Sequence, residues 1–198
     1  MCIRDRGVTN VGPDVQDLFL EKVNPDNPNQ AEFQGKWEDM QVVEERIAVK
    51  GRTEPVIETV RITRHGPIMN AVTSKIGEEA PLMAFRWTAL DSGKLFESVL
   101  QIDKAQNWEE FRSALQDWSA PSQNFVYADV DGNIGYQMPG QIPIRARGDG
   151  TVPVPGWTGE YEWTGNIPFD ELPSVYNPEV GYVATANNQV VPDSYPYL

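Results

Sequence analysis

The sequence predicts a strand-rich α+β protein. Several segments alternate apolar and polar residues with the two-residue period of a β-strand, and 16 glycines and 16 prolines make an all-helical bundle a poor fit. One segment, residues 108–118, instead repeats its apolar side chains at helical spacing. With 40% hydrophobic residues, a chain of 198 residues can bury the core of one domain or of two small ones.

Two segments near the N-terminus are predicted to lie outside the regular elements. Residues 1–6 fit no periodic pattern and resemble leaders that arise when assembly adaptors are translated in environmental sequences, so we expect the domain to comprise residues 7–198. Residues 24–30 are dense in proline, asparagine and aspartate, which favour turns, and they predict a surface loop.

The next segment has the pattern of a β-hairpin. From Met40 the residues alternate between an apolar and a polar face, with Glu45 placed among the apolar residues. A turn at residues 50–52 follows, and residues 59–63 then alternate again. The two segments are therefore expected to pair, up to the Gly66-Pro67 step, which ends or bulges the second strand.

The middle of the chain contains both predicted helices. Residues 82–87 predict a short strand, and residues 95–102 predict a helical turn or helix. Asn107 followed three residues later by Glu110 is a capping signal, so residues 108–118 should form an amphipathic helix.

The last predicted hairpin joins residues 125–130 to residues 133–137. Asp131-Gly132 tolerates the positive φ angles of a tight type I′ turn. Turns are expected to dominate residues 139–173, and residues 181–184 form an apolar segment that we interpret as a strand.

The composition excludes several classes of function. A formal net charge of -13 argues against binding nucleic acid or an anionic membrane, whose phosphates attract clustered lysine and arginine. No apolar stretch approaches the roughly 20 residues needed to span a bilayer. Cys2 is the only cysteine, so an internal disulfide or a multi-cysteine zinc site cannot form. After Arg147 seven acids and no base follow, a composition suited to holding a cation.

Two acidic runs are candidate cation sites. Asp14 and Asp17 offer two carboxylates with backbone carbonyls between them, which are the hard oxygen ligands that Ca²⁺ prefers. The run from Asp129 to Asn133 resembles the start of an EF-hand loop, but Gly140 stands where the closing glutamate is required. For this run the hairpin interpretation is favoured.

Other chemistry-bearing residues have a structural alternative. His65, the sole histidine, lies at a predicted strand end, where one structural hydrogen bond is favoured over a role as base. Cys2 would become an N-terminal thiol if Met1 were removed, although its place in the leader argues against that role. Asn187 and Asn188 can donate to an oxyanion, but a turn is favoured from sequence pattern alone.

Three aromatic residues suggest an alternative function. A secreted β-rich module could stack a glycan on Trp157, Tyr161 and Trp163 and hold a structural cation at Asp14 and Asp17. Core or loop packing is the favoured role of these rings.

Five motifs together resemble the penicillin amidase family, whose members are N-terminal-nucleophile amide hydrolases. They are Thr-Asn-Val-Gly-Pro-Asp-Val-Gln-Asp-Leu (residues 9–18), Arg-His-Gly-Pro-Ile (64–68), Tyr-Ala-Asp-Val-Asp-Gly-Asn-Ile-Gly-Tyr (127–136), Pro-Val-Pro-Gly-Trp (153–157) and Gly-Tyr-Val-Ala-Thr-Ala-Asn-Asn (181–188). The resemblance implies part of a four-layer αββα sandwich with mostly antiparallel sheets. It also implies a self-cleaving precursor that frees a nucleophilic serine, which we expect upstream of this chain.

The resemblance assigns roles to five residues. Asn187 matches the side-chain donor of the family's oxyanion hole, and Asn10 matches the residue whose backbone N–H is the second donor. Asp14 and Asp17 match calcium-site carboxylates, with Gln16 giving a backbone carbonyl. A further calcium ligand of the family, an acid of the small chain, has no counterpart in these residues.

The activity implied is hydrolysis of a linear amide through an acyl-serine intermediate. The expected partners are an acylated small-molecule substrate and the small chain of the same processed precursor, with no nucleic acid and no membrane. The family implies a periplasmic or secreted protein, and this fragment is expected to be inactive alone. Penicillin amidases, cephalosporin acylases and acyl-homoserine lactone acylases share the scaffold, so the acyl group stays open.

Overall fold

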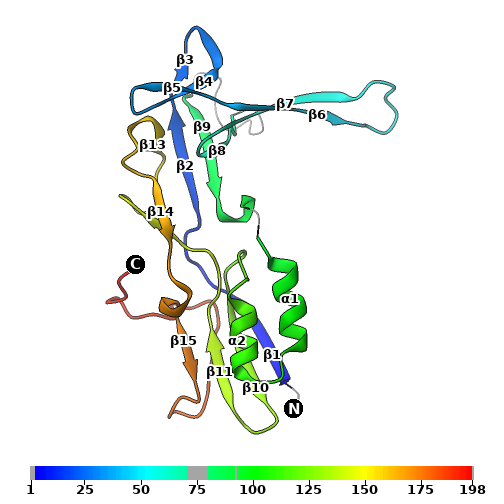
Figure 1. The fold of residues 1–198 in the computed structure, drawn as a ribbon, viewed down its shortest axis with the longest axis vertical. Helices are drawn as coiled ribbons and strands as arrows, with labels where there is room; N and C mark the ends of the chain where they lie inside the picture. The colour runs from blue at the N-terminus through cyan, green and yellow to red at the C-terminus, as the bar shows by residue number, and fades with distance from the viewer. Residues whose placement is uncertain (1–2, 71–79, 92, 198) are drawn as a thin grey trace. The chain divides into compact units, whose positions relative to one another are not determined.

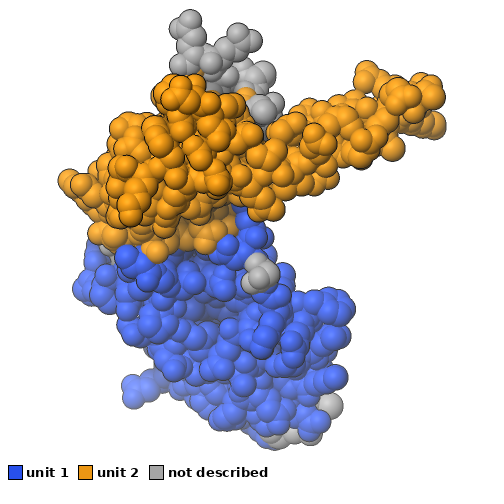
Figure 2. Space-filling model, turned by 45° about the horizontal axis from the view of Figure 1, so that its top comes forward, with its two compact units in different colours: residues 1–15, 88–144, 164–198 blue, residues 16–87, 145–163 orange. Residues whose placement is uncertain are grey.

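The computed structural model describes residues 3–70, 80–91 and 93–197 (Figure 1). Its described part is mostly β-sheet with two α-helices, which confirms the α+β class. The chain folds into two compact units: unit 1 comprises residues 1–15, 88–144 and 164–198, and unit 2 comprises residues 16–87 and 145–163 (Figure 2).

Unit 1 contains a four-stranded antiparallel sheet with the strand order β1-β10-β11-β15. Helices α1 and α2 and two short 3₁₀ helices accompany it. The bounds are β1 Ile3–Asn10, β10 Gln123–Asp129, β11 Ile134–Gln137, β15 Ser174–Tyr176, α1 Leu95–Lys104, α2 Trp108–Leu115, η1 Thr88–Leu90 and η3 Phe169–Glu171.

Helix α2 forms the core of unit 1 with strand β10. Phe111 and Leu115 are fully buried, and the Trp108 ring meets Tyr127 edge-on with ring centroids 5.4 Å apart. Gly135 is required beneath this helix, because an added Cβ would lie 2.5 Å from the Trp108 ring. The predicted cap is confirmed: the Asn107 side chain accepts a hydrogen bond from the Glu110 backbone N–H at 2.8 Å.

The hairpin of β10 and β11 is confirmed, but its predicted two-residue turn is wrong. The last pair of the ladder is Ala128 with Ile134, and the Asp129 backbone N–H also donates to the Asn133 carbonyl oxygen at 3.0 Å, so residues 130–132 form the loop. The Asp129 carboxylate accepts backbone N–H bonds from Asp131 and Asn133, and this side chain closes a wider loop than a type I′ turn.

Unit 2 is built from three small sheets with strand orders β13-β2-β9, β3-β4-β5 and β6-β7-β8. Phe19 on β2 and Ala84 on β9 are buried at its core. The bounds are β2 Gln16–Glu21, β3 Val23–Asn24, β4 Asn27–Phe33, β5 Lys36–Asp39, β6 Gln41–Ile47, β7 Val56–Thr63, β8 Gly66–Pro67, β9 Leu82–Trp87, β13 Val154–Pro155 and η2 Gly156–Thr158. A further two-stranded sheet pairs β12 Pro143–Arg145 with β14 Trp163–Asn166.

The predicted strand over residues 82–87 and the predicted hairpin of β6 and β7 are both confirmed. The hairpin ends at a sharp turn into β8, where Gly66 has φ +134° and an added Cβ would lie 2.1 Å from the Phe85 carbonyl oxygen. Only glycine fits there.

Three further sequence predictions are wrong. Residues 3–6, predicted to lie outside the regular elements, form the start of β1, where Arg6 pairs with Tyr127 on β10. Residues 24–30 do not form one loop, because β4 begins at Asn27 and pairs with both β3 and β5. Residues 181–184, all of which the structure describes, do not form a strand. Val183 instead packs against the core of unit 1 from an irregular segment.

Candidate functional site

Asn10 and Asn187 lie together in unit 1, although 177 positions separate them in the chain. Asn10 ends strand β1 and pairs with Gln123 on β10. Asn187 belongs to the irregular C-terminal segment, and its side-chain Nδ2 donates a hydrogen bond to the Asn10 carbonyl oxygen at 2.8 Å. Both residues are exposed. An asparagine amide carries two N–H donors, so Asn187 can direct the second toward a ligand.

The backbone of Asn187 has φ +62°, which lies in the left-handed region that asparagine tolerates better than most residues. Next to it, the Asn188 side chain accepts a hydrogen bond from the Ala186 backbone N–H at 3.0 Å. A turn therefore forms here, as the sequence pattern favoured, and this turn presents the Asn187 amide to Asn10.

A buried asparagine on β10 supports the Asn10–Asn187 pair from the protein interior. Asn124 on β10 is fully buried, and its Nδ2 lies 3.1 Å from the Thr9 hydroxyl and 3.2 Å from the Asn10 carbonyl oxygen, donating to both. Its Oδ1 accepts from the Tyr136 hydroxyl at 2.6 Å. Burial raises the pKa of Tyr136, so this hydroxyl stays protonated and donates. Sequence reasoning missed Asn124, for which a polar residue inside an apolar strand is the available signal.

A second contact ties the C-terminal segment to β1. The Thr9 hydroxyl donates to the Thr185 hydroxyl at 2.9 Å. The Asn10 side chain in turn accepts from Gln123 at 3.1 Å. Asn10 is thus held through its carbonyl and its side chain, which fixes the orientation of its peptide.

The three residues expected to bind calcium lie at the start of β2. Asp17 is 5% exposed, and its Oδ2 accepts from Arg145 at 2.9 Å and from the Trp163 indole N–H. Arg145 also donates to the Gln16 carbonyl oxygen at 3.4 Å. Asp14 is exposed.

These oxygen donors have the chemistry that calcium requires, but a guanidinium already binds two of them. A calcium ion would therefore share Asp17 and Gln16 with a positive charge. Within residues 3–70, 80–91 and 93–197, no cluster of three or more histidine, cysteine, aspartate or glutamate residues is arranged to hold a metal ion.

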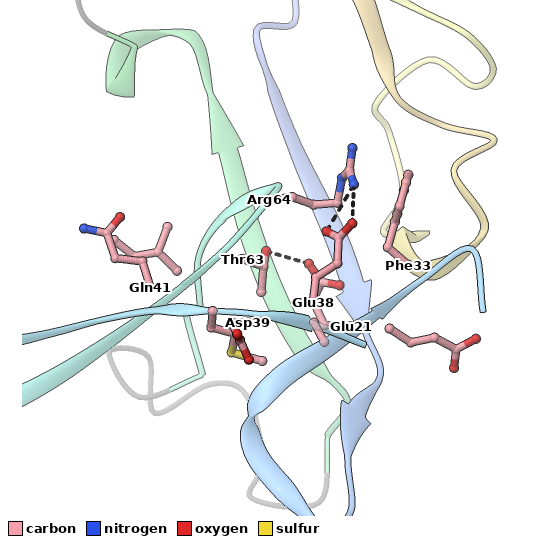
Figure 3. Close-up of a pocket in the computed structure, with 11 residues that line it drawn as sticks. Glu21, Phe33, Glu38, Asp39, Gln41, Thr63 and Arg64 are labelled. Carbon is pink, nitrogen blue, oxygen red and sulfur yellow. Dashed lines mark hydrogen bonds and ion pairs between the residues drawn. The ribbon is translucent and has the colours of Figure 1, made fainter. Parts of the chain in front are cut away.

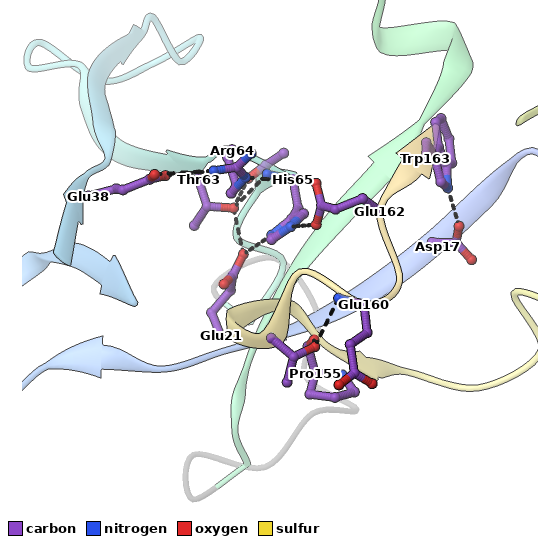
Figure 4. A network of polar contacts seen from close by, with 12 residues as sticks. Asp17, Glu21, Glu38, Thr63, Arg64, His65, Pro155, Glu160, Glu162 and Trp163 are labelled. Atoms are coloured by element: carbon purple, nitrogen blue, oxygen red, sulfur yellow. Dashed lines mark hydrogen bonds and ion pairs between the residues drawn. The ribbon is translucent and has the colours of Figure 1, made fainter. Parts of the chain in front are cut away.

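His65 occupies a buried polar cluster in unit 2 (Figure 4). Its Nδ1 and Nε2 each lie 2.8 Å from a carboxylate oxygen, of Glu21 and Glu162 respectively. The Thr63 hydroxyl donates to the same Glu21 oxygen at 2.7 Å, and Phe19 stacks on the imidazole with ring centroids 4.1 Å apart. The structural interpretation of His65 is confirmed, with two ring contacts where one was expected.

A cavity of about 250 Å³ lies beside this cluster in unit 2 (Figure 3). Acidic side chains line much of it, but they have partners within the protein: Glu21 accepts from Thr63, and Glu38 binds Arg64 at 3.1 Å. These pairings make the cavity a structural feature of the unit.

The three aromatic residues of the glycan-binding alternative are engaged in packing. Lys22 lies 4.4 Å from the ring centroid of Trp157, and Arg86 lies 4.6 Å from that of Trp163. Tyr161 packs against the buried core of unit 2. These contacts do not favour a sugar-stacking surface. Cys2, the residue of the other alternative, lies outside the described residues.

A known protein family matches almost the whole chain. The sequence model described as penicillin amidase matches residues 7–198. The chain belongs to the penicillin amidase family. Across the described residues no helix is both long and apolar enough to cross a membrane.

Family relatives are similar over almost the whole chain. The acyl-homoserine lactone acylase QuiP of Pseudomonas fluorescens strain Pf-5 is 35% identical over 95% of this chain and 23% of its own length. The penicillin acylase 2 proenzyme of Pseudomonas sp. strain SE83 is 34% identical over 96% of this chain and 24% of its own length. The penicillin G acylase of Escherichia coli is 40% identical over 93% of this chain and 21% of its own length. The chain thus spans about a quarter of the length of these relatives.

A solved penicillin G acylase has a similar fold. The thermostable penicillin G acylase from Alcaligenes faecalis gives a TM-score of 0.79 at 36% identity, over 95% of this chain and 33% of that one. This likeness agrees with the α+β class and with the family assignment.

Proposed function

We propose that this chain is part of a penicillin acylase-like amide hydrolase. The parent protein cleaves a linear amide C–N bond of an acylated small molecule, and its fold is the four-layer αββα sandwich of the N-terminal-nucleophile hydrolases. The nucleophilic serine belongs to a part of the parent outside residues 1–198, so the fragment alone is inactive. Family membership over residues 7–198 supports the reaction class.

The observation that carries the proposal is the pairing of Asn187 with Asn10 at 2.8 Å. In the proposed reaction the serine Oγ attacks the amide carbonyl carbon, and its proton passes to the serine's own α-amine. The carbonyl oxygen becomes an oxyanion, which accepts hydrogen bonds from Asn187 Nδ2 and the Asn10 backbone N–H. Collapse of this intermediate expels the protonated amine, and water then hydrolyses the acyl-serine.

The surrounding contacts support these roles. An oxyanion hole must be oriented before the charge develops, because donors that reorganise during the reaction contribute less. Asn124 fixes the Asn10 carbonyl from the buried side, and Asn187 binds the same carbonyl from the exposed side.

The parent also binds a structural calcium ion in this proposal. Asp14 and Asp17 supply carboxylate oxygens, Gln16 supplies its carbonyl, and Arg145 shares two of these groups. The ion would stabilise the fold at the start of β2 and takes no part in the reaction.

The parent's processing and localisation complete the proposal. It is made as an inactive precursor, processed into a small and a large chain, and works in the periplasm or outside the cell. The name of one relative, a proenzyme, supports processing. Relatives named for penicillin and for acyl-homoserine lactones leave the acyl group open.

The test is an Asn187→Ala substitution in the full-length parent. Removing one oxyanion donor should lower kcat for amide hydrolysis by about 10²–10³-fold while the precursor still processes itself. Processing is followed by the masses of the chains, and hydrolysis by amine release from acylated substrates.

The matched control is Asn177→Ala. Asn177 is also exposed with a left-handed backbone, at φ +46°, and it bonds the backbone of β11. This variant should keep its turnover. Wild-type turnover in the Asn187→Ala parent would remove Asn187 from the site.

A further inference from the structure

The hairpin of β6 and β7 forms an arm of unit 2, here called the β6–β7 arm and comprising residues 41–63 (Figure 2). Strand β6 is the outer strand of a three-stranded sheet whose third strand, β8, has two residues. Most of the arm is therefore a two-stranded ribbon, and such a ribbon is marginally stable without a packing partner.

One face of the arm has an unusual composition. Directly opposite residues are Val43 with Val60, Glu45 with Glu58, and Ile47 with Val56, and opposite residues project from the same side of a sheet. Four aliphatic side chains thus surround two glutamates. Ile47 is 48% exposed, and both glutamates are exposed.

The facing glutamates oppose formation of the arm in isolation. Like charges directly across an antiparallel pair are destabilising, and here they interrupt an otherwise aliphatic face. A positively charged side chain of a binding partner, placed between the two glutamates, would remove their repulsion. Aliphatic side chains of the same partner would cover the four aliphatic residues of the arm. The face is thus complementary to a surface that carries one base among aliphatic residues.

We propose that this face binds a segment of the parent protein, outside residues 1–198, that places a lysine or arginine between Glu45 and Glu58. The chain spans about a quarter of the length of its curated relatives, which leaves ample polypeptide to supply the segment. The inference rests on the proposed function only in treating the chain as part of a longer parent.

The first test is photo-crosslinking in the full-length parent with a benzophenone amino acid at position 45, and with the same residue at position 44 as control. Glu44 is the next residue on β6 and lies opposite Thr59 on the other face. We expect position 45 to crosslink to a peptide outside residues 1–198 that contains a base, and position 44 to yield much less of it. Crosslinks to a second copy of the arm, or equal yields at both positions, would overturn the proposal.

The second test distinguishes a bound arm from a free arm by the sign of one effect. In a free arm Glu45→Lys would create an opposite-charge pair with Glu58 and raise hydrogen-exchange protection, by up to about fivefold. In a bound arm the new lysine would face the partner's base, so protection of residues 41–63 should fall instead. Thr59→Val on the other face changes no charge and should not lower protection, and a rise in the Glu45→Lys parent would refute the proposal.

Amide hydrolysis is measured in the same wild-type preparation. Loss of the predicted hydrolysis with an intact position-45 crosslink would refute the proposed function alone. Normal hydrolysis without the crosslink would refute the docking proposal alone.

Discussion

Unit 2 buries ionisable side chains around His65, whereas unit 1 buries a neutral amide, Asn124. The cluster of unit 2 places each ring nitrogen of His65 against a carboxylate, and its central residues Glu21 and His65 are 6% and 3% exposed. The cluster of unit 1 runs from buried Tyr136 through Asn124 to Asn10 and Asn187, which are exposed.

The difference separates a structural cluster from a candidate site. Buried ionisable groups must satisfy one another, since leaving one without a partner is costly. The His65 cluster therefore acts as a connection between β2, the turn before β8 and the segment before β14. The amide cluster of unit 1 ends at the surface, where its last members can meet a ligand.

The largest expected effect is on the stability of unit 2. His65→Ala removes the ring that binds both Glu21 and Glu162, and it should lower the free energy of unfolding by about 3–5 kcal/mol. Urea unfolding of the purified chain measures the loss. Glu160→Ala is the control, because this exposed residue pairs with Arg147 and should cost at most about 1 kcal/mol. Equal losses would contradict the structural role of His65.

Asn124→Ala should affect both stability and turnover. It leaves the buried Tyr136 hydroxyl without its acceptor, at a cost of about 1–3 kcal/mol, and it releases the Asn10 carbonyl. In the parent we expect kcat to fall with little change in KM, because the oxyanion donors act in the transition state. Tyr136→Phe keeps the Asn124 contact with Asn10 and should lower kcat less. The reverse order would argue that Asn124 only supports the fold.

Calcium should stabilise the parent, by about 1.4 kcal/mol at a concentration ten times the Kd. Asp14→Ala should weaken this response with little effect on the fold, since Asp14 is exposed. Arg145→Gln should strengthen it, because a positive charge leaves Asp17 and the Gln16 carbonyl. Thermal unfolding with and without calcium measures each response. An unchanged response in both variants would relegate Asp14 and Asp17 to a calcium-independent role.

The smallest effect concerns acid stability of the loop between β10 and β11. The Asn133 side chain, together with backbone N–H groups, lowers the pKa of Asp129. A lowered folded-state pKa stabilises the protein above the unfolded value, near 3.9, and that contribution is lost as pH falls through the folded value. The difference in Tm between wild type and Asp129→Asn should therefore disappear at acidic pH. A difference that stays constant would contradict this origin.

Local chemistry explains what the sequence predicted. The Asn107 cap, the strand at residues 82–87 and the β6–β7 pairing depend on neighbouring residues or on a simple alternation. The turn type was predicted wrongly at Asp129, whose carboxylate accepts two backbone N–H bonds in addition to the backbone bonds that close a three-residue loop.

The candidate site could not be predicted in this way. Asn10 and Asn187 were selected by resemblance to a family, and no periodicity brings residues 177 positions apart into contact. The partners of His65 lie 44 and 97 positions away, and Asn124 reaches Thr9 across 115 positions. These contacts depend on tertiary structure, which the sequence pattern does not contain. The catalytic roles of Asn10 and Asn187 stay predictions.

The division of the chain into interrupted units has a consequence for the order of synthesis. Unit 2 is complete in sequence once residue 163 has been made, but unit 1 needs the segment from residue 164 onward. Asn10 on β1 must wait for Gln123 on β10 before it can pair. At a synthesis rate of about 5–20 residues per second, β1 leaves the ribosome on the order of ten seconds before its partner. During that interval β1 is an unpaired strand in the nascent chain, open to chaperones or to wrong partners.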